Sequence, residues 1–332
     1  MRRIKVRRAK VRWALCRGAI AALAAVSAAA AVAVDLGKPN WRWGADDVRG
    51  AGNLVTAESI KAALAAVEQG QVVELSHDVA MGAPYIPGAQ TPYVMTMATT
   101  SANMEKLLRE HRGATNEVGF YLERIEMTTH VSTHIDALGH VTVAAELYNG
   151  GNRAEAASDA GLNRLGIDQA PAFIAPGVLI DVAAYKGVEM LEPGYAITPA
   201  DLQGALAKQG TEIPEGAIVF IHTGWGRNFT AKPELYAATG PGIGLAASQW
   251  LAAKNVVAIG ADNMTLEVIP GEDPQVIFPV HQHLLVKQGI YIVENVKSDE
   301  LAASKRYRAT ILMLPTKYRG ATGTPLRIVA LY

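Results

Sequence analysis

One short segment restricts the fold of this chain more than any other. Eleven consecutive residues, from His130 to His140, contain three of the chain's eight histidines and an aspartate. Side chains on an extended backbone alternate between two faces, so the even spacing of His130, His134 and Asp136 predicts that all three point to one side. His140 has the same parity and joins them if the extended run continues that far. A helix would still align His130 with His134, but it would turn Asp136 away.

The donor types in this segment indicate a bound metal ion. Two imidazole nitrogens and a carboxylate oxygen on one face suit Zn, Mn, Fe or Co, and an aspartate can bridge two ions. The alternative is a pair of histidines that only hydrogen-bond within a core. Far downstream, His281 and His283 precede Glu294, which ends an apolar, strand-like run. Burial of Glu294 would be costly unless it meets a cation, although its carboxylate could also reach solvent at the strand end. Spacing alone does not choose between the two histidines.

Charge and cysteine content exclude several other classes of function. Eight of the 31 Lys and Arg residues lie within residues 1–17, where there is no acid. The rest of the chain has 23 basic and 31 acidic residues, a net charge of −8, so it lacks the basic surface that a nucleic-acid-binding protein needs. Cys16 is the single cysteine. If the N-terminus is removed, disulfides, a thiol nucleophile and cysteine-bound zinc are excluded, and any metal must be held by His, Asp and Glu.

The N-terminus has the pattern of an export signal. The basic run precedes an alanine-rich apolar stretch of sixteen residues at 19–34, with small residues at 31–33. This pattern predicts a signal peptide over residues 1–33, cleaved after about Ala33. The alternative is a membrane anchor, but such a helix spans only about 24 Å of a bilayer core that is roughly 30 Å thick. We therefore expect an exported, periplasmic or secreted protein without stable membrane insertion after processing.

Residues 34–332 predict a single α/β domain with a strand-rich core. Short apolar runs bounded by glycine or charge are typical of buried strands, and helical spacing marks longer segments between them. We expect strands at residues 71–75, 120–127, 178–182, 218–222, 256–259 and 290–293, and helices at 56–69, 198–209 and 245–254. Residues 82–118 contain three prolines and predict a long irregular segment that acts as a lid or binding loop, with a solvated excursion as the alternative.

The histidine segment resembles a known signature. Its sequence, His-Val-Ser-Thr-His-Ile-Asp-Ala-Leu-Gly-His, is similar to the His-x-Gly-Thr-His-x-Asp-x-Pro-x-His motif of the cyclase family, which contains bacterial kynurenine formamidases and isatin hydrolases. Further stretches resemble the longer members of that family, at residues 43–47, 53–56, 75–77, 147–150, 197–202, 223–225, 260–262 and 281–295. The resemblance implies a swivelling β/β/α fold, a homo-oligomer (dimer or tetramer), and a hydrolase that uses one or two divalent ions, Zn or Mn.

The same resemblance assigns metal ligands. It implies that His130, His134 and Asp136 bind a first ion, and that Asp136 also bridges to a second ion held by Glu294 and a downstream histidine. We favour His281 for that histidine because it precedes a pair of leucines, as the family's histidine does.

The resemblance further implies that His140 is the acid/base residue rather than a ligand. An imidazole with an unperturbed pKa of about 6.5 can take a proton from water and return it to a leaving nitrogen. Two positions depart from the signature, because Ser132 replaces its glycine and Leu138 replaces its proline. The stretch between His281 and Glu294 is also one residue longer than we expect for a kynurenine formamidase.

Taken together, these features predict a metal-dependent hydrolase that cleaves the C–N bond of a small amide. The substrate would be an N-formyl aryl amide or a cyclic amide of the isatin type. One alternative is a metal-dependent lyase, dehydratase or cyclase that acts on a small carbonyl compound, and another is an exported protein that binds a ligand without catalysis. We expect Phe120, Tyr121, Trp225 and His77 to line the substrate pocket, with plain core packing as the alternative.

Overall fold

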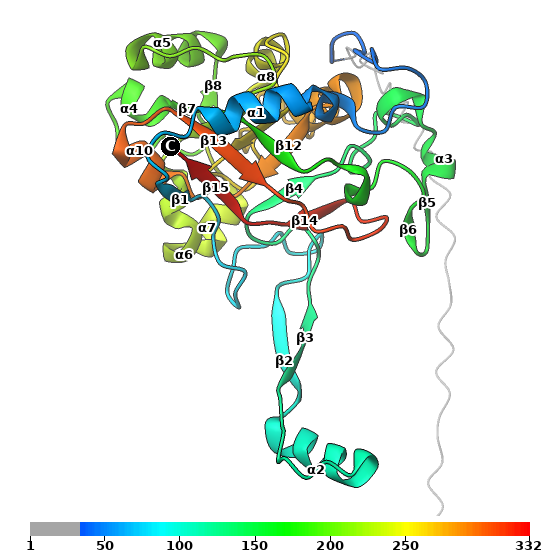
Figure 1. Ribbon diagram of the computed structural model, residues 1–332. Coiled ribbons are helices and arrows are strands. Elements are labelled where there is room, and N and C mark those ends of the chain that lie inside the picture. Colours follow the sequence, from blue (N-terminus) through cyan, green and yellow to red (C-terminus); the bar gives the residue numbers. More distant parts are fainter. Residues whose placement is uncertain (1–33) are drawn as a thin grey trace, which may run out of the picture. The chain divides into compact units, whose positions relative to one another are not determined.

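Nine strands drawn from both halves of the chain form the central sheet (Figure 1). The computed structural model describes residues 34–332. The order of strands is β1 (Val72–Glu74), β15 (Ile328–Leu331), β13 (Arg308–Met313), β7 (Phe173–Asp181), β9 (Ile218–His222), β11 (Ala258–Ala261), β12 (Tyr291–Glu294), β4 (His134–Asp136) and β14 (Gly323–Pro325). Strands β7, β9, β11 and β12 are parallel. The strands on either side of this group pair antiparallel, and they include β4, which carries part of the histidine segment.

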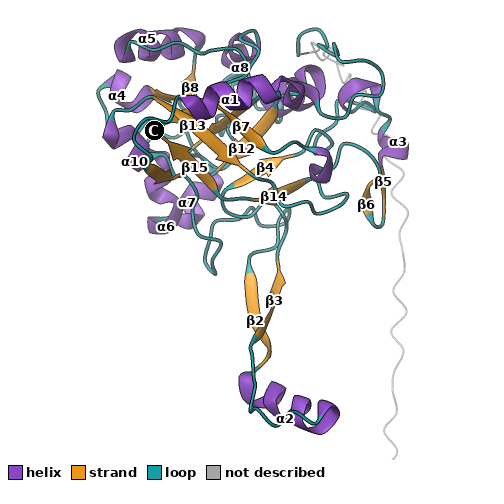
Figure 2. Ribbon diagram, viewed as in Figure 1, coloured by secondary structure: helices purple, strands orange, loops and turns teal. Residues whose placement is uncertain are grey.

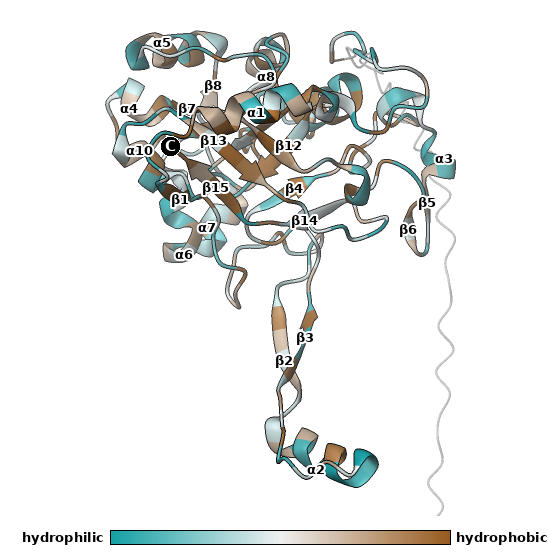
Figure 3. Ribbon diagram, viewed as in Figure 1, coloured by the Kyte–Doolittle hydropathy of each residue, from teal (hydrophilic) through white to brown (hydrophobic). Residues whose placement is uncertain are grey.

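The parallel strands are buried because helices cover them, which explains why they appear in the sequence as continuous apolar runs. Every residue of β9, β11 and β12 is buried, and Figure 3 shows that the central strands are strongly hydrophobic. Helices α1 (Ala57–Ala65) and α5 (Pro199–Gln209) pack against β7, and α10 (Asp299–Ser304) packs against β7 and β1. The predicted α/β architecture with a strand-rich core is confirmed. The runs predicted at 178–182, 218–222, 256–259 and 290–293 each overlap one of these parallel strands, and the run at 71–75 overlaps β1.

Two of the three predicted helices begin at a side-chain cap. Thr56 accepts a hydrogen bond from the backbone of Ser59, whose hydroxyl accepts one from the backbone of Thr56, at the start of α1. Thr198 and Asp201 form the same reciprocal pair at the start of α5. The third predicted helix is α8 (Leu245–Ala252). Shorter elements are α3 (Arg153–Ala156), α4 (Val182–Lys186), α6 (Asn228–Ala231), α7 (Pro233–Ala238), α9 (Pro279–His281), β5 (Ala157–Ser158), β6 (Gly161–Leu162), β8 (Ala196–Ile197) and β10 (Gly242–Ile243).

The prediction of an irregular segment over residues 82–118 is wrong for its second half. Strand β2 (Val94–Thr99) pairs with β3 (Leu122–Glu126), and helix α2 (Ser101–Arg112) lies between them. Figures 1 and 2 show this ribbon projecting from the body with α2 at its far end. The helix forms because Thr100 caps its first turn and Gly113, at a φ of 66°, ends it in the left-handed conformation. We call residues 94–126 the arm.

The predicted signal peptide lies at residues 1–33, outside the described residues. Among the described residues, no helix combines the length and the apolar character that crossing a bilayer would require.

Candidate metal centre

Strand pairing brings the two predicted ligand groups together. β4 lies between β12 and β14, and its register places His134 directly opposite Glu294. Residues opposite each other in an antiparallel pair lie on the same face. Because His134 and Asp136 are two residues apart in β4, they share that face with Glu294. The long gap in sequence between the two groups is therefore closed by a single strand pair.

The extended run is shorter than the sequence argument assumed. Only His134–Asp136 form a strand, because Ser132 adopts a φ of 62° in the left-handed region and turns the chain just before it. Its hydroxyl donates to the backbone carbonyls of His77 and Asp78, 3.1 Å from each, which helps to hold this conformation. The parity argument thus applies to two residues of the segment, and His130 and His140 reach the site from the turns on either side.

Five side chains converge in two groups that share Asp136. His130, His134 and Asp136 offer ligand atoms within 4.8 Å of one another, and so do Asp136, His281 and Glu294. Nε2 of His134 lies 3.1 Å from Oε2 of Glu294, and Nε2 of His281 lies 3.0 Å from Oε1 of Glu294. Nδ1 of His130 lies 2.8 Å from Oδ1 of Asp136. The carboxylates of Asp136 and Glu294 therefore stand between imidazoles on both sides.

Several donor atoms of these two groups are buried without a hydrogen-bond partner, which suits a cation. Both carboxylate oxygens of Asp136 and Nε2 of His134 are buried and make no hydrogen bond to any described residue, although other ligand atoms lie close by. Buried polar atoms without partners cost free energy, and a divalent ion would satisfy all three at once. We conclude that these residues fit a metal ion with nitrogen and oxygen ligands.

Each histidine of the two groups has its second ring nitrogen tied elsewhere. Nδ1 of His134 lies 2.8 Å from the carbonyl oxygen of Ser132, and Nε2 of His130 lies 2.9 Å from Oγ1 of Thr322. Nδ1 of His281 lies 2.5 Å from Oε1 of Glu267. Such contacts fix the ring orientation and leave the other nitrogen free to face the metal position.

The close contacts within the group shift the pKa values of its members. Burial alone would raise the pKa of Asp136, but the neighbouring imidazoles of His140 and His130 hold that pKa well below its usual value. Burial would lower the pKa of His134, yet the adjacent carboxylate of Glu294 raises it. Burial and the charge of Asp136 would raise the pKa of Glu294, but its contacts with His134 and His281 lower it. Both carboxylates therefore stay ionised, which is the form that binds metal.

His140 lies beside the ligand groups and not within them. Its ring stacks on that of His130, with centroids 4.1 Å apart, and lies 6.5 Å from the ring of His281. Burial lowers the pKa of His140 to about 4, and the nearby charge of Asp136 only partly offsets this effect. His140 is thus a neutral imidazole at pH 7, able to accept a proton.

Of the two downstream histidines, His281 faces the site. His283 points elsewhere, and its Nδ1 lies 2.7 Å from the backbone carbonyl oxygen of Leu36. The two differ because both lie in a helical run, α9 followed by the π-helical segment η5 (Gln282–Gln288), in which residues two positions apart do not share a face. The structure therefore separates the histidines that spacing alone could not.

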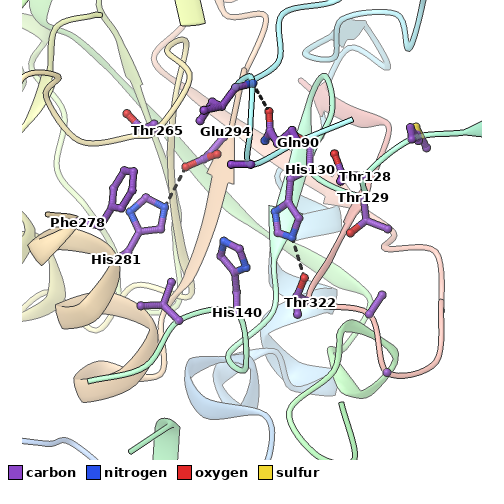
Figure 4. A pocket seen from close by; sticks show the side chains of 16 residues that line it. Gln90, Thr128, Thr129, His130, His140, Thr265, Phe278, His281, Glu294 and Thr322 are labelled. Atoms are coloured by element: carbon purple, nitrogen blue, oxygen red, sulfur yellow. Dashed lines mark hydrogen bonds and ion pairs between the residues drawn. The ribbon is translucent and has the colours of Figure 1, made fainter. Parts of the chain in front are cut away.

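A cavity of about 700 Å³ opens over the ligand groups. Figure 4 shows His130, His140, His281 and Glu294 facing one another across it. Among the described residues that line the cavity, none is Lys or Arg. The rest of its wall is apolar or carries neutral polar groups: Ile86, Ala89, Gln90, Met127, Thr128, Thr129, Val141, Thr265, Phe278, Gly320, Ala321 and Thr322.

The prediction of the pocket walls is wrong for this cavity, because it is lined by none of Phe120, Tyr121, Trp225 and His77. Phe120 and Tyr121 lie in the arm with 42% and 62% of their surfaces exposed. Trp225 is buried in a small core below the arm's base. His77 stacks on Phe229, with centroids 3.8 Å apart, and lines a different hollow. Aromatic character alone cannot tell a cavity wall from a core or surface position.

Sequence reasoning also missed residues that support the site. Glu267 and Thr322 each hold a ligand histidine, and Phe278 packs against the ring of His281 with centroids 5.2 Å apart. A single Glu, Thr or Phe far from the histidine segment gives no signal in the sequence, because only the tertiary fold brings it there.

Comparison with known proteins places the chain in a family and supports its fold. The family described as putative cyclase matches residues 73–268. A crystal structure described as a novel cyclase is 33% identical, covers 89% of this chain and 98% of that chain, and has a TM-score of 0.79. Isatin hydrolase A from Ralstonia solanacearum is 22% identical, with 82% and 96% of the two chains covered and a TM-score of 0.58. A predicted metal-dependent hydrolase from Bacillus stearothermophilus is 18% identical, with 79% and 98% covered and a TM-score of 0.51. The search of curated proteins gave no match.

Proposed function

This chain belongs to the family of putative cyclases, and from that membership we propose that it is a metal-dependent hydrolase that cleaves the C–N bond of a small, uncharged amide. The observation that carries the proposal is the pair of ligand groups that share Asp136, at the base of a cavity with a neutral imidazole beside them. That combination supplies a place for an electrophile and for a base within one enclosed space.

We assign Zn or Mn as the metal, with one or two ions bound. His130, His134 and Asp136 would hold the first, and Asp136, His281 and Glu294 the second. When bound, a divalent ion polarises a carbonyl and lowers the pKa of water from 15.7 to about 7. Glu267 would keep His281 oriented, because it lies against the ring nitrogen that faces away from Glu294.

His140 would move the proton. As a neutral imidazole it can take a proton from the attacking water and later return it to the leaving nitrogen. Hydrolysis then consumes one water and yields a carboxylic acid and an amine. Its stacking on His130 keeps the ring next to the ligand groups.

The cavity wall supports an uncharged substrate. Away from the metal position, a carboxylate or phosphate buried against the cavity wall would need a cationic partner, and none of the described lining residues is Lys or Arg. The apolar side chains of Met127, Val141 and Phe278 suit a ring. We therefore propose a cyclic amide of the isatin type or an N-formyl aryl amide without a charged group. One of the similar structures is an isatin hydrolase, and it supports the first of these classes. The proposal also includes export, which rests on the sequence of residues 1–33.

The test is product analysis on the purified protein loaded with Zn or with Mn. The assay offers isatin, N-formylaniline and cyclic imides, each with and without a carboxylate substituent. We expect products that gain one water, and a strong preference for the uncharged member of each pair. Loss of water with a new double bond would identify a lyase instead. Tight binding of the same compounds without turnover would identify a binding protein.

A further inference from the structure

A second cluster of buried ionisable side chains lies at the carboxyl ends of the parallel strands, outside both ligand groups. Asp181 ends β7 and His222 ends β9, and strand register places the two side by side. Asp262 follows β11 directly and comes next to His222 in the adjacent strand. Asp181 is 6% exposed, His222 5% and Asp262 0%. The proposed hydrolysis uses none of the three, so their burial needs another explanation.

A hollow of about 230 Å³ opens over Asp181 and His222, between α4 and α10 (Figure 1). In open α/β sheets, ligands commonly bind outside the carboxyl ends of the strands, where the strand order reverses. Here the order reverses at β7, because β9, β11 and β12 follow it on one side and β13 lies on its other side. The hollow therefore lies where folds of this class bind ligands.

One edge of the His222 ring is held by the protein and the other edge faces the hollow. Nδ1 lies 2.7 Å from Oγ of Ser298 and 3.2 Å from Oδ2 of Asp262. Burial would raise the pKa of Asp262, but the imidazole of His222 lowers it, so the carboxylate is ionised and only accepts hydrogen bonds. Nδ1 therefore carries the hydrogen. Neither Ser298 nor Asp262 lines the hollow, whereas His222 does, so Nε2 on the opposite edge faces it. No hydrogen bond to a described residue satisfies Nε2, which is left as an acceptor.

Two carboxylates beside this ring have oxygens to spare. Oδ1 of Asp181 accepts a hydrogen bond from the backbone N–H of Ala184, 2.8 Å away, at the start of α4. No described cation forms an ion pair with Asp181, because Arg227 is paired with Glu189 at 3.0 Å and with Asp299 at 3.5 Å. Asp299 uses only Oδ1 for that contact. A buried carboxylate without a cationic partner costs free energy, and Asp181 is in that state.

The electrostatic field in the hollow favours a positive charge. Burial lowers the pKa of His222, but the charge of Asp262 outweighs burial and raises it. Asp181 and Asp299 act in the same direction. A field that stabilises an added proton also attracts other cations.

The spacing of these acceptors suits an ammonium group better than a metal ion. Among the described residues, groups of three ligand atoms within 4.8 Å of one another occur at the metal centre and not in this hollow. Hydrogen bonds from an ammonium are about 2.7–3.2 Å long and reach further than metal–ligand bonds of about 2.0–2.6 Å.

We propose that this hollow binds the ammonium group of a small aliphatic amine. An ammonium has three N–H donors, and Asp181, Asp299 and Nε2 of His222 offer one acceptor each. The ligand would supply the positive charge that the buried carboxylate of Asp181 lacks.

The rest of the wall suits a short alkyl chain. Ala183, Ala184 and Ala303 line the hollow, whose volume of about 230 Å³ holds roughly seven groups of the size of a water molecule. Lys305 also lines the hollow and is exposed. The ammonium therefore belongs either to a free amine or to an amino acid whose carboxylate meets Lys305.

Isothermal titration of the metal-loaded chain with n-butylamine tests the proposal. We expect a Kd of about 1 mM or tighter, which is within reach of a ligand with five non-hydrogen atoms. The uncharged n-butanol should bind at least about 10-fold more weakly. Asp181→Asn should weaken the binding of n-butylamine by about 30-fold or more, because it removes one partner of a buried charge pair, while asparagine still caps α4. The matched control is Asp201→Asn, because Asp201 is also 6% exposed and lies at the start of α5, outside the hollow.

Two further variants locate the site. Ala303 is exposed on α10 and lines the hollow, so Ala303→Leu fills the space without a change of charge and should weaken binding by about 10-fold or more. This variant keeps the test decisive if Asp181→Asn does not fold. Asp136→Asn disrupts the metal centre and should leave the affinity for n-butylamine unchanged. Loss of binding in Asp136→Asn would place the amine on the metal and overturn the proposal.

The proposal would also be overturned by a wild type that binds no n-butylamine up to ~50 mM, or by equal affinities for n-butylamine and n-butanol. Unchanged affinity in a folded Asp181→Asn or in Ala303→Leu would have the same consequence. Titration with γ-aminobutyrate separates the two sources of the ammonium group. Tighter binding than that of n-butylamine, removed by Lys305→Gln, would identify an amino acid, and equal or weaker binding would identify a free amine.

Discussion

The ligand groups and the arm are neighbours in sequence but opposite in environment. β3 ends at Glu126, and the ligand segment begins at His130. On one side of this short link, apolar side chains are exposed without cover, and on the other, carboxylate oxygens and an imidazole nitrogen are buried without partners. Large apolar side chains are usually buried, and buried polar atoms usually have hydrogen-bond partners. The arm departs from the first rule, and the ligand groups depart from the second. The difference teaches that the two regions are suited to different chemistry, because the first presents apolar side chains to its surroundings and the second presents donor atoms that fit a cation.

The two regions also differ in how they are held. β4 is paired on both sides, by β12 and β14, in the middle of a buried core. The arm is held mainly by local interactions, such as the cap of Thr100 and the exposed ion pair of Arg109 with Glu105 in α2. Exposed pairs of this kind contribute only about 0.3–0.5 kcal/mol. Changes in the ligand region should therefore alter metal binding, catalysis and folding, whereas changes in the arm should have little effect on the stability of the core.

The largest effect is expected from Asp136→Asn, which keeps the shape of the side chain but removes the charge shared by both ligand groups. Metal content and activity should each fall below about a hundredth of the wild-type value, because even the loss of a residue that only supports a ligand costs 10–100-fold. Elemental analysis and the hydrolysis assay measure the two effects. The control is Asp159→Asn at an exposed position. Metal retained at wild-type stoichiometry would show that Asp136 is not a ligand.

His140→Ala separates a catalyst from a ligand in the same buried region. Because His140 lies outside both ligand groups, the variant should keep its metal and lose roughly 10²–10⁴-fold in kcat, the usual contribution of general acid–base catalysis. Metal analysis and steady-state kinetics on one preparation test both halves. Simultaneous loss of metal and activity would place His140 among the ligands, and unchanged kcat would remove it from the mechanism.

The contrast in burial can be tested with one substitution at two sites ten residues apart. Ile135 in β4 is fully buried, whereas Ile125 in β3 is 54% exposed. Ile135→Ala should lower the free energy of unfolding by about 2–5 kcal/mol. Ile125→Ala should change it by less than about 0.5 kcal/mol at concentrations where the chain is monomeric. Denaturant melts of both variants provide the comparison, and equal losses would mean that the arm is part of the folded core.

A smaller effect is expected from Glu267→Gln. Glu267 lies 2.5 Å from Nδ1 of His281 and holds the ring so that Nε2 faces Glu294. Loss of such a supporting carboxylate should weaken metal affinity by about 10–100-fold and leave the fold intact. Metal titration with a competing chelator measures the change, with the exposed Glu215→Gln as control. An affinity equal to that of the control would show that the orientation of His281 is set by packing alone.

These particular residues show where sequence reasoning reached its limit. The buried strands could be predicted because their apolar runs follow directly from burial on both faces. Placing His134 and Asp136 on one face succeeded because β4 is extended exactly there. The same parity could not position His140, since its backbone N–H donates to Ala137 in a turn. The strand predicted at residues 120–127 corresponds to β3 of the arm, but β2 and α2 were missed, because the alternation of Met95, Thr96 and Met97 is short and follows a proline-rich stretch. Glu267 could not be predicted because its role exists only in the tertiary fold.

The smallest effect is expected at Ser132, where the family signature has glycine. Its φ of 62° disfavours any residue with a Cβ, but its hydroxyl donates to the carbonyls of His77 and Asp78. Ser132→Gly relieves the backbone and removes these hydrogen bonds, so the two terms oppose and the free energy of unfolding should change by less than about 1 kcal/mol. Ser132→Ala removes the hydrogen bonds and keeps the Cβ, so it should be less stable than the glycine variant by about 1 kcal/mol. Denaturant melts compare the two. If the alanine variant is the more stable, the left-handed backbone conformation at residue 132 does not favour glycine. The explanation of why the strand starts only at His134 would then fail as well.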